Sequence, residues 1–246
     1  MRGDLPLKHP SQANNMTEIK KRFQHIDHEI RQAEQQAKRA THSVQLLAVS
    51  KTWPAERLRE VAELGQQRFG ENYLQEALEK ITALADLNLE WHFIGPIQSN
   101  KTRDIANHFD WVHTIDREKI ARRLNEQRPT SLEKLNVCIQ LNIDDEASKS
   151  GIPIADLMPL AEKIEQMENL HLRGIMIIPA PTENTEQQTT TFRLAQDLFK
   201  KLQAIYPQID TLSMGMTNDM SAAINAGSTM VRIGTALFGS RNVKSQ

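Results

Sequence analysis

The chain has little cysteine and no excess of charge of one sign. Its one cysteine, Cys138, lies inside the apolar run 137–141, which excludes an internal disulfide framework and a cysteine-based metal site. The 30 Lys and Arg residues are balanced by 31 Asp and Glu residues, for a formal net charge of -1. No general basic field therefore favours nucleic acid or an anionic membrane as a partner, and small-molecule chemistry is the better expectation.

Long apolar stretches are also missing. No run of about 18 apolar residues is present, so the sequence predicts no membrane-spanning helix. Residues 1–15 are polar, contain two prolines and lack the apolar segment of a signal peptide. We expect residues 1–15 to be a flexible N-terminal extension and residues 16–246 to form one domain in the reducing environment of the cytoplasm, because the first periodic segment opens at Met16.

Short apolar runs alternate with amphipathic helical segments along the whole chain. A helix over residues 17–41 precedes the first run, and no Gly/Ser-rich linker divides the rest of the chain. This alternation predicts a single parallel (β/α)8 barrel, with the leading helix in the place usually taken by a helix after strand eight. The expected strands cover residues 44–51, 68–69, 91–94, 111–114, 136–143, 172–178, 211–214 and 229–233.

The first strand ends in a lysine. The run Val-Gln-Leu-Leu-Ala-Val-Ser is closed by Lys51, and Pro54 follows in the first turn of the next helix. An amine held against apolar neighbours is less readily protonated and can add to a carbonyl to form a Schiff base. The alternative is a solvated lysine at a strand terminus.

A phosphate site is predicted after strands seven and eight. In (β/α)8 barrels these two loops and a short extra helix commonly hold a phosphate. Here Ser213 ends strand seven before Gly215, and Gly234 and Thr235 follow strand eight, so backbone amides, hydroxyls and a helix start are available. Ordinary turn glycines and a capping threonine are the alternative.

Two further polar residues lie near predicted strand ends. Arg232 alternates with Val231 and Ile233, which places it inside the barrel, where it meets either a carboxylate such as Glu71 or a ligand beside the phosphate. Asn72 is expected to cap the helix after strand two. The acidic loop 144–146 lacks the ligand spacing of a calcium loop, so we expect solvated carboxylates and no metal site.

Several motifs in order carry a family resemblance. From about Met16 to Arg241 the chain resembles the pyridoxal phosphate homeostasis protein family, which is similar to the barrel (N-terminal) domain of alanine racemase and lacks that enzyme's second, all-β domain. The motifs are Ala48-Val49-Ser50-Lys51-Thr52, Phe69-Gly70-Glu71-Asn72-Tyr73, Trp91-His92-Phe93-Ile94-Gly95 with Gln98-Ser99-Asn100-Lys101, Ser148-Lys149-Ser150-Gly151, Leu212-Ser213-Met214-Gly215-Met216 and Val231-Arg232-Ile233-Gly234-Thr235.

The resemblance implies a set of pyridoxal 5'-phosphate contacts and no metal. It implies that Lys51 forms the Schiff base, that Ser213, Gly234 and Thr235 contact the phosphate, and that the guanidinium of Arg232 meets the pyridine nitrogen. The resemblance also implies that three residues line the cofactor: Asn72, His92 and Met214. From the residues alone, His92 is equally well interpreted as a hydrogen-bonded core histidine, because it alternates with Phe93 on a strand.

The same roles favour a carrier over a catalyst. An arginine leaves the pyridine nitrogen unprotonated and the ring a poor electron sink. Alanine racemase also uses a tyrosine base from its partner subunit, whereas the only tyrosines here are Tyr73 and Tyr206. We therefore expect no catalytic residues and a cytoplasmic buffer that binds pyridoxal phosphate and releases it to apoenzymes, as a monomer or weak dimer.

Two other classes of function remain open at this point. An enzyme, either an amino-acid racemase or a class I aldolase, would use the same Lys51. A regulatory module would present the bound cofactor as a signal to a protein partner.

Overall fold

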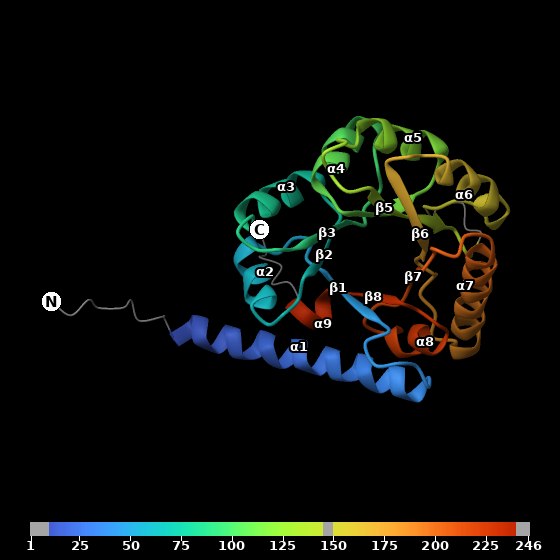
Figure 1. The fold of residues 1–246 in the computed structure, drawn as a ribbon. Coiled ribbons are helices and arrows are strands. Elements are labelled where there is room, and N and C mark those ends of the chain that lie inside the picture. The colour runs from blue at the N-terminus through green and yellow to red at the C-terminus, as the bar shows by residue number, and fades with distance from the viewer. Residues whose placement is uncertain (1–9, 145–149, 240–246) are drawn as a thin grey trace.

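Eight parallel strands close into a barrel in the computed structural model, in the order β1-β2-β3-β4-β5-β6-β7-β8 (Figure 1). The structure describes residues 10–144 and 150–239. The last strand returns to the first, with Gln45 opposite Met230 and Ala48 opposite Ile233. The predicted fold class and its single barrel are therefore confirmed.

The strands lie close to their predicted positions and differ by a few residues at their ends. Each one coincides with one of the short segments that the sequence predicts as strands. Their bounds are β1 Gln45–Val49, β2 Arg68–Glu71, β3 Glu90–Phe93, β4 Trp111–Ile115, β5 Leu135–Leu141, β6 Leu170–Ile177, β7 Thr211–Ser213 and β8 Met230–Ile233.

Helices connect successive strands and cover the outside of the barrel (Figure 1). The α-helices are α1 Pro10–Gln36, α2 Ala55–Ala62, α3 Leu74–Ala83, α4 Thr102–His108, α5 Glu118–Gln127, α6 Leu157–Glu165, α7 Thr185–Ile205, α8 Met220–Asn225 and α9 Thr235–Phe238. Two 3-10 turns, η1 Ser99–Lys101 and η2 Ile154–Asp156, precede α4 and α6. Within the described residues no helix is long and apolar enough to cross a membrane.

Helix α1 contacts α2, α8 and α9 across the junction of β1 and β8, the place predicted for it (Figure 1). It starts at Pro10, earlier than the sequence pattern predicts. Residues 1–9 of the expected extension lie outside the described residues, and the division at residue 15 stays a prediction. The buried carboxylate of Glu34 accepts the amides of His42 and Val44 at 3.0 and 2.7 Å, which fixes the turn between α1 and β1.

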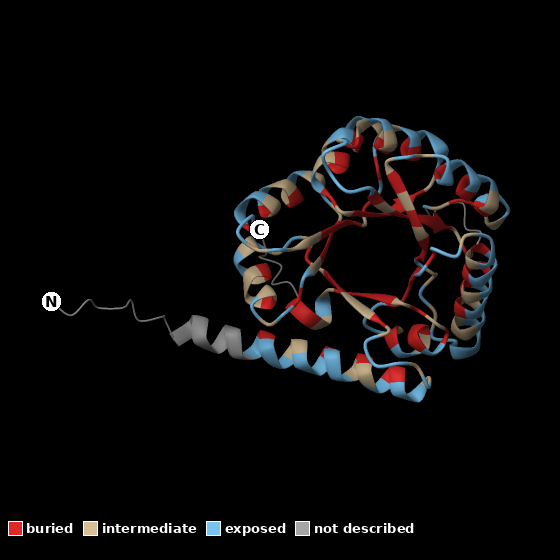
Figure 2. Ribbon diagram, in the orientation of Figure 1, coloured by how far each residue is buried: buried red, intermediate tan, exposed pale blue. Residues whose placement is uncertain are grey.

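Buried residues line the strands and the inner faces of the helices (Figure 2). One apolar cluster runs from α1 through every layer to α9. Cys138 belongs to a smaller cluster with Trp111 and Met176 and is buried there, as its place in the apolar run 137–141 would lead one to expect. Because the strands are buried on both faces, the polar residues among them are few, and each needs a partner.

Candidate functional site

A cavity of about 540 Å³ opens at the carboxyl ends of the strands. Loops after β1, β2, β3, β5, β6, β7 and β8 contribute to its lining, which is the end of a (β/α)8 barrel where active sites form. Five of the eight predicted site residues lie together in its wall: Lys51, Asn72, Arg232, Gly234 and Thr235. The volume is in the range of small-molecule sites.

Lys51 lies two residues after β1 on a sharply turned backbone. Thr52 has a φ of 69°, a left-handed conformation that is uncommon for a side chain branched at Cβ. Trp53 then stacks on Phe238 at the end of α9, with 5.8 Å between ring centroids. The half-buried Lys51 is therefore held between strand β1 and the segment after β8.

A second lysine, Lys80, holds this turn in place through hydrogen bonds. The buried Nζ of Lys80 in α3 lies 2.8 Å from Glu71 Oε1 and donates to the Ser50 carbonyl oxygen at 2.8 Å. Glu71 also accepts from the Ser50 hydroxyl at 2.6 Å, and burial raises its pKa in spite of the lysine. Glu76 joins Lys80 to the amide of Thr52. The residues on both sides of Lys51 are thus fixed by one ion-pair network.

Asn72 does not cap the helix after strand two. The residue before α3 is Tyr73, and it makes no side-chain cap, so the predicted cap is wrong. The Oδ1 atom of Asn72 is instead buried without a hydrogen-bond partner at the cavity wall. Gly95 packs directly behind it, because a Cβ there would lie 2.2 Å from the Asn72 carbonyl oxygen. Such an unpaired buried acceptor is suited to a donor group of a ligand.

Arg232 is buried inside the barrel, as the strand alternation predicts. Its Nη1 donates to Ser213 Oγ at 2.9 Å and its Nη2 to the Ile177 carbonyl oxygen at 2.8 Å. The alternative ion pair with Glu71 is wrong, since that carboxylate is bound by Lys80. Burial lowers the pKa of Arg232 to about 10, so it stays a cation at neutral pH, and donors remain for a ligand in the cavity.

Gly234 and Thr235 form the edge of the cavity beside β1. A Cβ at Gly234 would lie 3.1 Å from the Val49 carbonyl oxygen, so the glycine allows this backbone to approach strand β1 closely. Thr235 is the first residue of α9, where amides have no acceptor inside the helix. This segment can offer amides and a hydroxyl to an anion.

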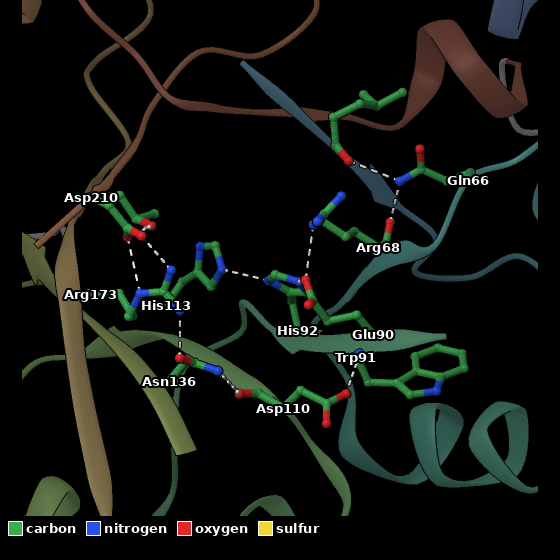
Figure 3. Close-up of polar contacts among 12 residues, drawn as sticks. Gln66, Arg68, Glu90, Trp91, His92, Asp110, His113, Asn136, Arg173 and Asp210 are labelled. Atoms are coloured by element: carbon green, nitrogen blue, oxygen red, sulfur yellow. Dashed lines mark hydrogen bonds and ion pairs between the residues drawn. The ribbon is translucent and has the colours of Figure 1, made fainter. Parts of the chain in front are cut away.

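The other three predicted residues are not among those that line the cavity. His92 is fully buried between Glu90 and His113, in the hydrogen-bonded core position that the sequence left as an alternative (Figure 3). Ser213 lies behind Arg232, and Met214 packs in the apolar core. Direct contact of these three with a cofactor stays a prediction.

Much of the cavity rim was not predicted from the sequence. The missed residues lie in the loops after β6 and β7 and at the start of α7; they include Thr182, Gln187, Gln188, Thr191, Met216, Thr217, Asn218 and Asp219. These residues follow predicted strands, and the segments after the strands carry the site of a (β/α)8 barrel, so their position could have indicated that they line the cavity. Asp144 of the acidic loop accepts the amide of Ala180, whereas residues 145–149, with the Ser148-Lys149 motif, lie outside the described residues.

Comparisons with known proteins agree with this geometry. The family description "Alanine racemase, N-terminal domain" matches residues 22–242. A pyridoxal phosphate homeostasis protein of Vibrio alginolyticus is 55% identical over 231 residues, which cover 92% of this chain and 99% of that protein. One from Haemophilus influenzae is 56% identical over 221 residues, which cover 88% of this chain and 93% of that protein.

Solved structures give the same result. PipY of Synechococcus elongatus, in a structure with pyridoxal phosphate (PLP) bound, is 36% identical with a TM-score of 0.74, over 86% of this chain and 99% of that one. An alanine racemase of Corynebacterium glutamicum shares the fold at 19% identity and a TM-score of 0.62, over 90% of this chain and 62% of that one.

Proposed function

This chain belongs to the pyridoxal phosphate homeostasis protein family, and from that membership we propose that it binds pyridoxal phosphate in the barrel cavity and buffers its free concentration. One observation carries the proposal: Lys51, Arg232 and the Gly234 backbone line the same cavity. The relatives' name and the loaded PipY structure support the choice of ligand.

The chemistry of the cavity wall fits this cofactor. Pyridoxal phosphate presents an aldehyde, a ring nitrogen, a ring hydroxyl and a phosphate dianion. The wall presents an amine, a guanidinium, the unpaired Asn72 Oδ1 and a backbone segment at Gly234. The cations Lys51 and Arg232 offset the negative charge of the ligand, and the unpaired acceptor gains a partner on binding.

When bound, the cofactor supplies an aldehyde carbon to which a primary amine adds reversibly. We assign that amine to Lys51, which the network of Lys80, Glu71 and Glu76 holds in place. Amides and the hydroxyl of Gly234 and Thr235 would bind the phosphate, and Arg232 would donate to the ring nitrogen. Ser213 would act through Arg232, which it orients.

We propose that the protein is a carrier and not an enzyme. A guanidinium at the ring nitrogen leaves that nitrogen an acceptor, which disfavours carbanion chemistry. Of the described side chains that line the cavity none is a tyrosine, and Tyr73 is exposed beside the barrel. The relatives are named as homeostasis proteins, and we propose cytoplasmic apoenzymes as recipients of the released cofactor.

The absorption spectrum of the full chain, mixed with pyridoxal phosphate and then separated from unbound cofactor, tests this proposal. We expect a visible band that hydroxylamine removes, and no such band from Lys51→Ala. Lys101→Ala is the matched control, because Lys101 is an exposed lysine at the end of the 3-10 turn η1 and does not line the cavity. A colourless wild-type mixture, or a Lys51→Ala protein with an unchanged band, would contradict the proposal.

A further inference from the structure

A line of polar side chains, buried except for the partly exposed Glu90 at one end, crosses the barrel interior. At one end, Glu90 at the start of β3 lines a second cavity, of about 320 Å³, near the amino-terminal ends of the strands, together with Arg68 and Arg173. At the other end, Arg232 lines the candidate site. The two cavities therefore lie at opposite ends of one interior, and polar groups connect them.

Each step along this line is a hydrogen bond. His92 Nε2 lies 2.8 Å from Glu90 Oε1, and His92 Nδ1 lies 2.9 Å from His113 Nε2 (Figure 3). His113 Nδ1 lies 3.1 Å from Ser213 Oγ, which accepts from Arg232 at 2.9 Å. These residues come from β3, β4, β7 and β8, so the line is a product of the closed barrel.

The two ends fix the direction of every bond between them. An ionised carboxylate only accepts, so Glu90 requires the hydrogen of His92 on Nε2. A neutral imidazole has one donor and one acceptor, so Nδ1 of His92 accepts from Nε2 of His113. Nδ1 of His113 then accepts in turn, and the Ser213 hydroxyl hydrogen points to it. The Ser213 oxygen is left to accept from Arg232, which only donates.

The protonation states needed for this order follow from the surroundings. Both histidines are fully buried, and burial lowers the pKa of His92 and places that of His113 well below its usual value. The charge of Arg232 disfavours a cation at His113 further. Burial raises the pKa of Glu90, whereas the hydrogen bond from the neutral His92 and the charge of Arg68 lower it, and the net direction is downward.

We propose that Glu90 is a positioning residue for the cofactor site, acting through His92 and His113 on the Ser213 hydroxyl. With its hydrogen committed to His113, Ser213 presents only its oxygen toward Arg232. That acceptor and the Ile177 carbonyl oxygen hold the guanidinium with its other donors toward the cavity. The effect on the cofactor rests on the proposed function, whereas the order of the hydrogen bonds does not.

Nitrogen NMR of the cofactor-free wild-type chain tests the order directly. Correlations between ring protons and ring nitrogens identify which nitrogen of each histidine carries hydrogen, and His92→Gln and His113→Gln assign the signals. We expect both residues to be neutral with hydrogen on Nε2. Hydrogen on Nδ1 of either residue, or on both nitrogens, overturns the proposal, and this result needs no variant at position 90.

Two substitutions of Glu90 test the coupling to the site. Glu90→Gln keeps an oxygen that accepts from His92 and Arg68, whereas Glu90→Leu removes the acceptor. We expect Glu90→Leu to change the His113 nitrogen signals and to weaken pyridoxal phosphate binding about fivefold, the change that corresponds to the loss of about 1 kcal/mol from one hydrogen bond. Glu90→Gln should restore both properties.

Three outcomes separate this inference from the proposed function. Unchanged His113 signals in Glu90→Leu overturn the relay, and changed signals with unchanged affinity overturn its coupling to the site. If Glu90→Gln loses as much affinity as Glu90→Leu, the positioning role of Glu90 is also contradicted. If the wild type binds no pyridoxal phosphate, the proposed function fails and the coupling with it, while the order of the hydrogen bonds is still decided by the NMR signals.

Discussion

The ammonium of Lys80 lies 2.8 Å from Glu71 Oε1 and, like the carboxylate beside it, is buried. The pair lies directly under the Ser50 carbonyl, one residue before Lys51, and its second carboxylate partner, Glu76, contacts the amide of Thr52. The position of the candidate reactive amine thus depends on a lysine that does not line the cavity.

Replacement of Lys80 by methionine should destabilise the fold and displace the Lys51 turn. Loss of one partner leaves the buried Glu71 carboxylate uncompensated, which costs about 3–5 kcal/mol. We expect this loss in the free energy of unfolding measured with urea. We also expect a weaker visible band with pyridoxal phosphate at a temperature where the variant is folded.

Lys163→Met is the matched control for that variant. Lys163 pairs with Glu118 on the surface, where both side chains are about half exposed. Surface pairs contribute little to stability, so this variant should resemble the wild type in both measurements. Equal stability of the two variants would refute the bracing role of Lys80.

Gly95→Ala should damage the site through Asn72. The new Cβ would lie 2.2 Å from the Asn72 carbonyl oxygen, and backbone has to move to accept it. Gly70→Ala is the matched control, because the three atoms nearest to its Cβ would be side-chain atoms of Ile94 and Leu47, at 3.1–3.3 Å. We expect Gly95→Ala to lower the free energy of unfolding by more than the roughly 1–3 kcal/mol typical of overpacking. Gly70→Ala should lower the free energy of unfolding by no more than that amount.

Calorimetric titration of the two glycine variants with pyridoxal phosphate supplies the second readout. Gly95→Ala should bind more weakly than Gly70→Ala, since only the former moves the backbone of a cavity residue. Similar affinity in the two variants would show that the position of Asn72 does not matter for binding.

Stability should fall as the pH drops below about 6.5, partly because of the barrel histidines. The pKa values of His92 and His113 are lowered in the folded chain, so below that pH the unfolded chain binds protons that the folded chain does not bind. The stability that the neutral buried histidines contribute is fully present above about pH 6.5. As the pH falls below this value, that stability is lost at up to about 1.4 kcal/mol per pH unit for each histidine.

Urea unfolding at about pH 7 and about pH 5.5 checks this sign. His113→Gln should lose less stability between the two values than the wild type does. The exposed His28→Gln is the control and should follow the wild type. If His113→Gln loses as much stability between the two pH values as the wild type does, the buried neutral state of His113 is contradicted.

The barrel and the main site residues follow from local sequence patterns. Short apolar runs gave the eight strands, and the place of Lys51 and Gly234 at strand ends gave two sides of the cavity. Alternation in β8 predicted that Arg232 points inward, which its contacts with Ser213 and Ile177 confirm. These inferences need only the period of a strand and the rule for where barrels carry sites.

Contacts between distant parts of the chain could not be predicted in the same way. His113 and Ser213 are 100 residues apart and meet only because the barrel closes. Lys80 lies in an amphipathic helix, where a lysine is ordinarily expected on the solvent face. The pattern Trp111-Val112-His113 places His113 on the same face as Trp111, and this signal could have indicated an inward histidine.

The most direct test of the proposed site is the position of the covalent bond. The full chain is incubated with pyridoxal phosphate, reduced with borohydride and digested, and the modified lysine is located by mass spectrometry. We predict a pyridoxyl group on Lys51, which lines the cavity with Arg232 and Gly234. Modification of another lysine in its place, with Lys51 unmodified, would contradict the assignment of the reactive amine.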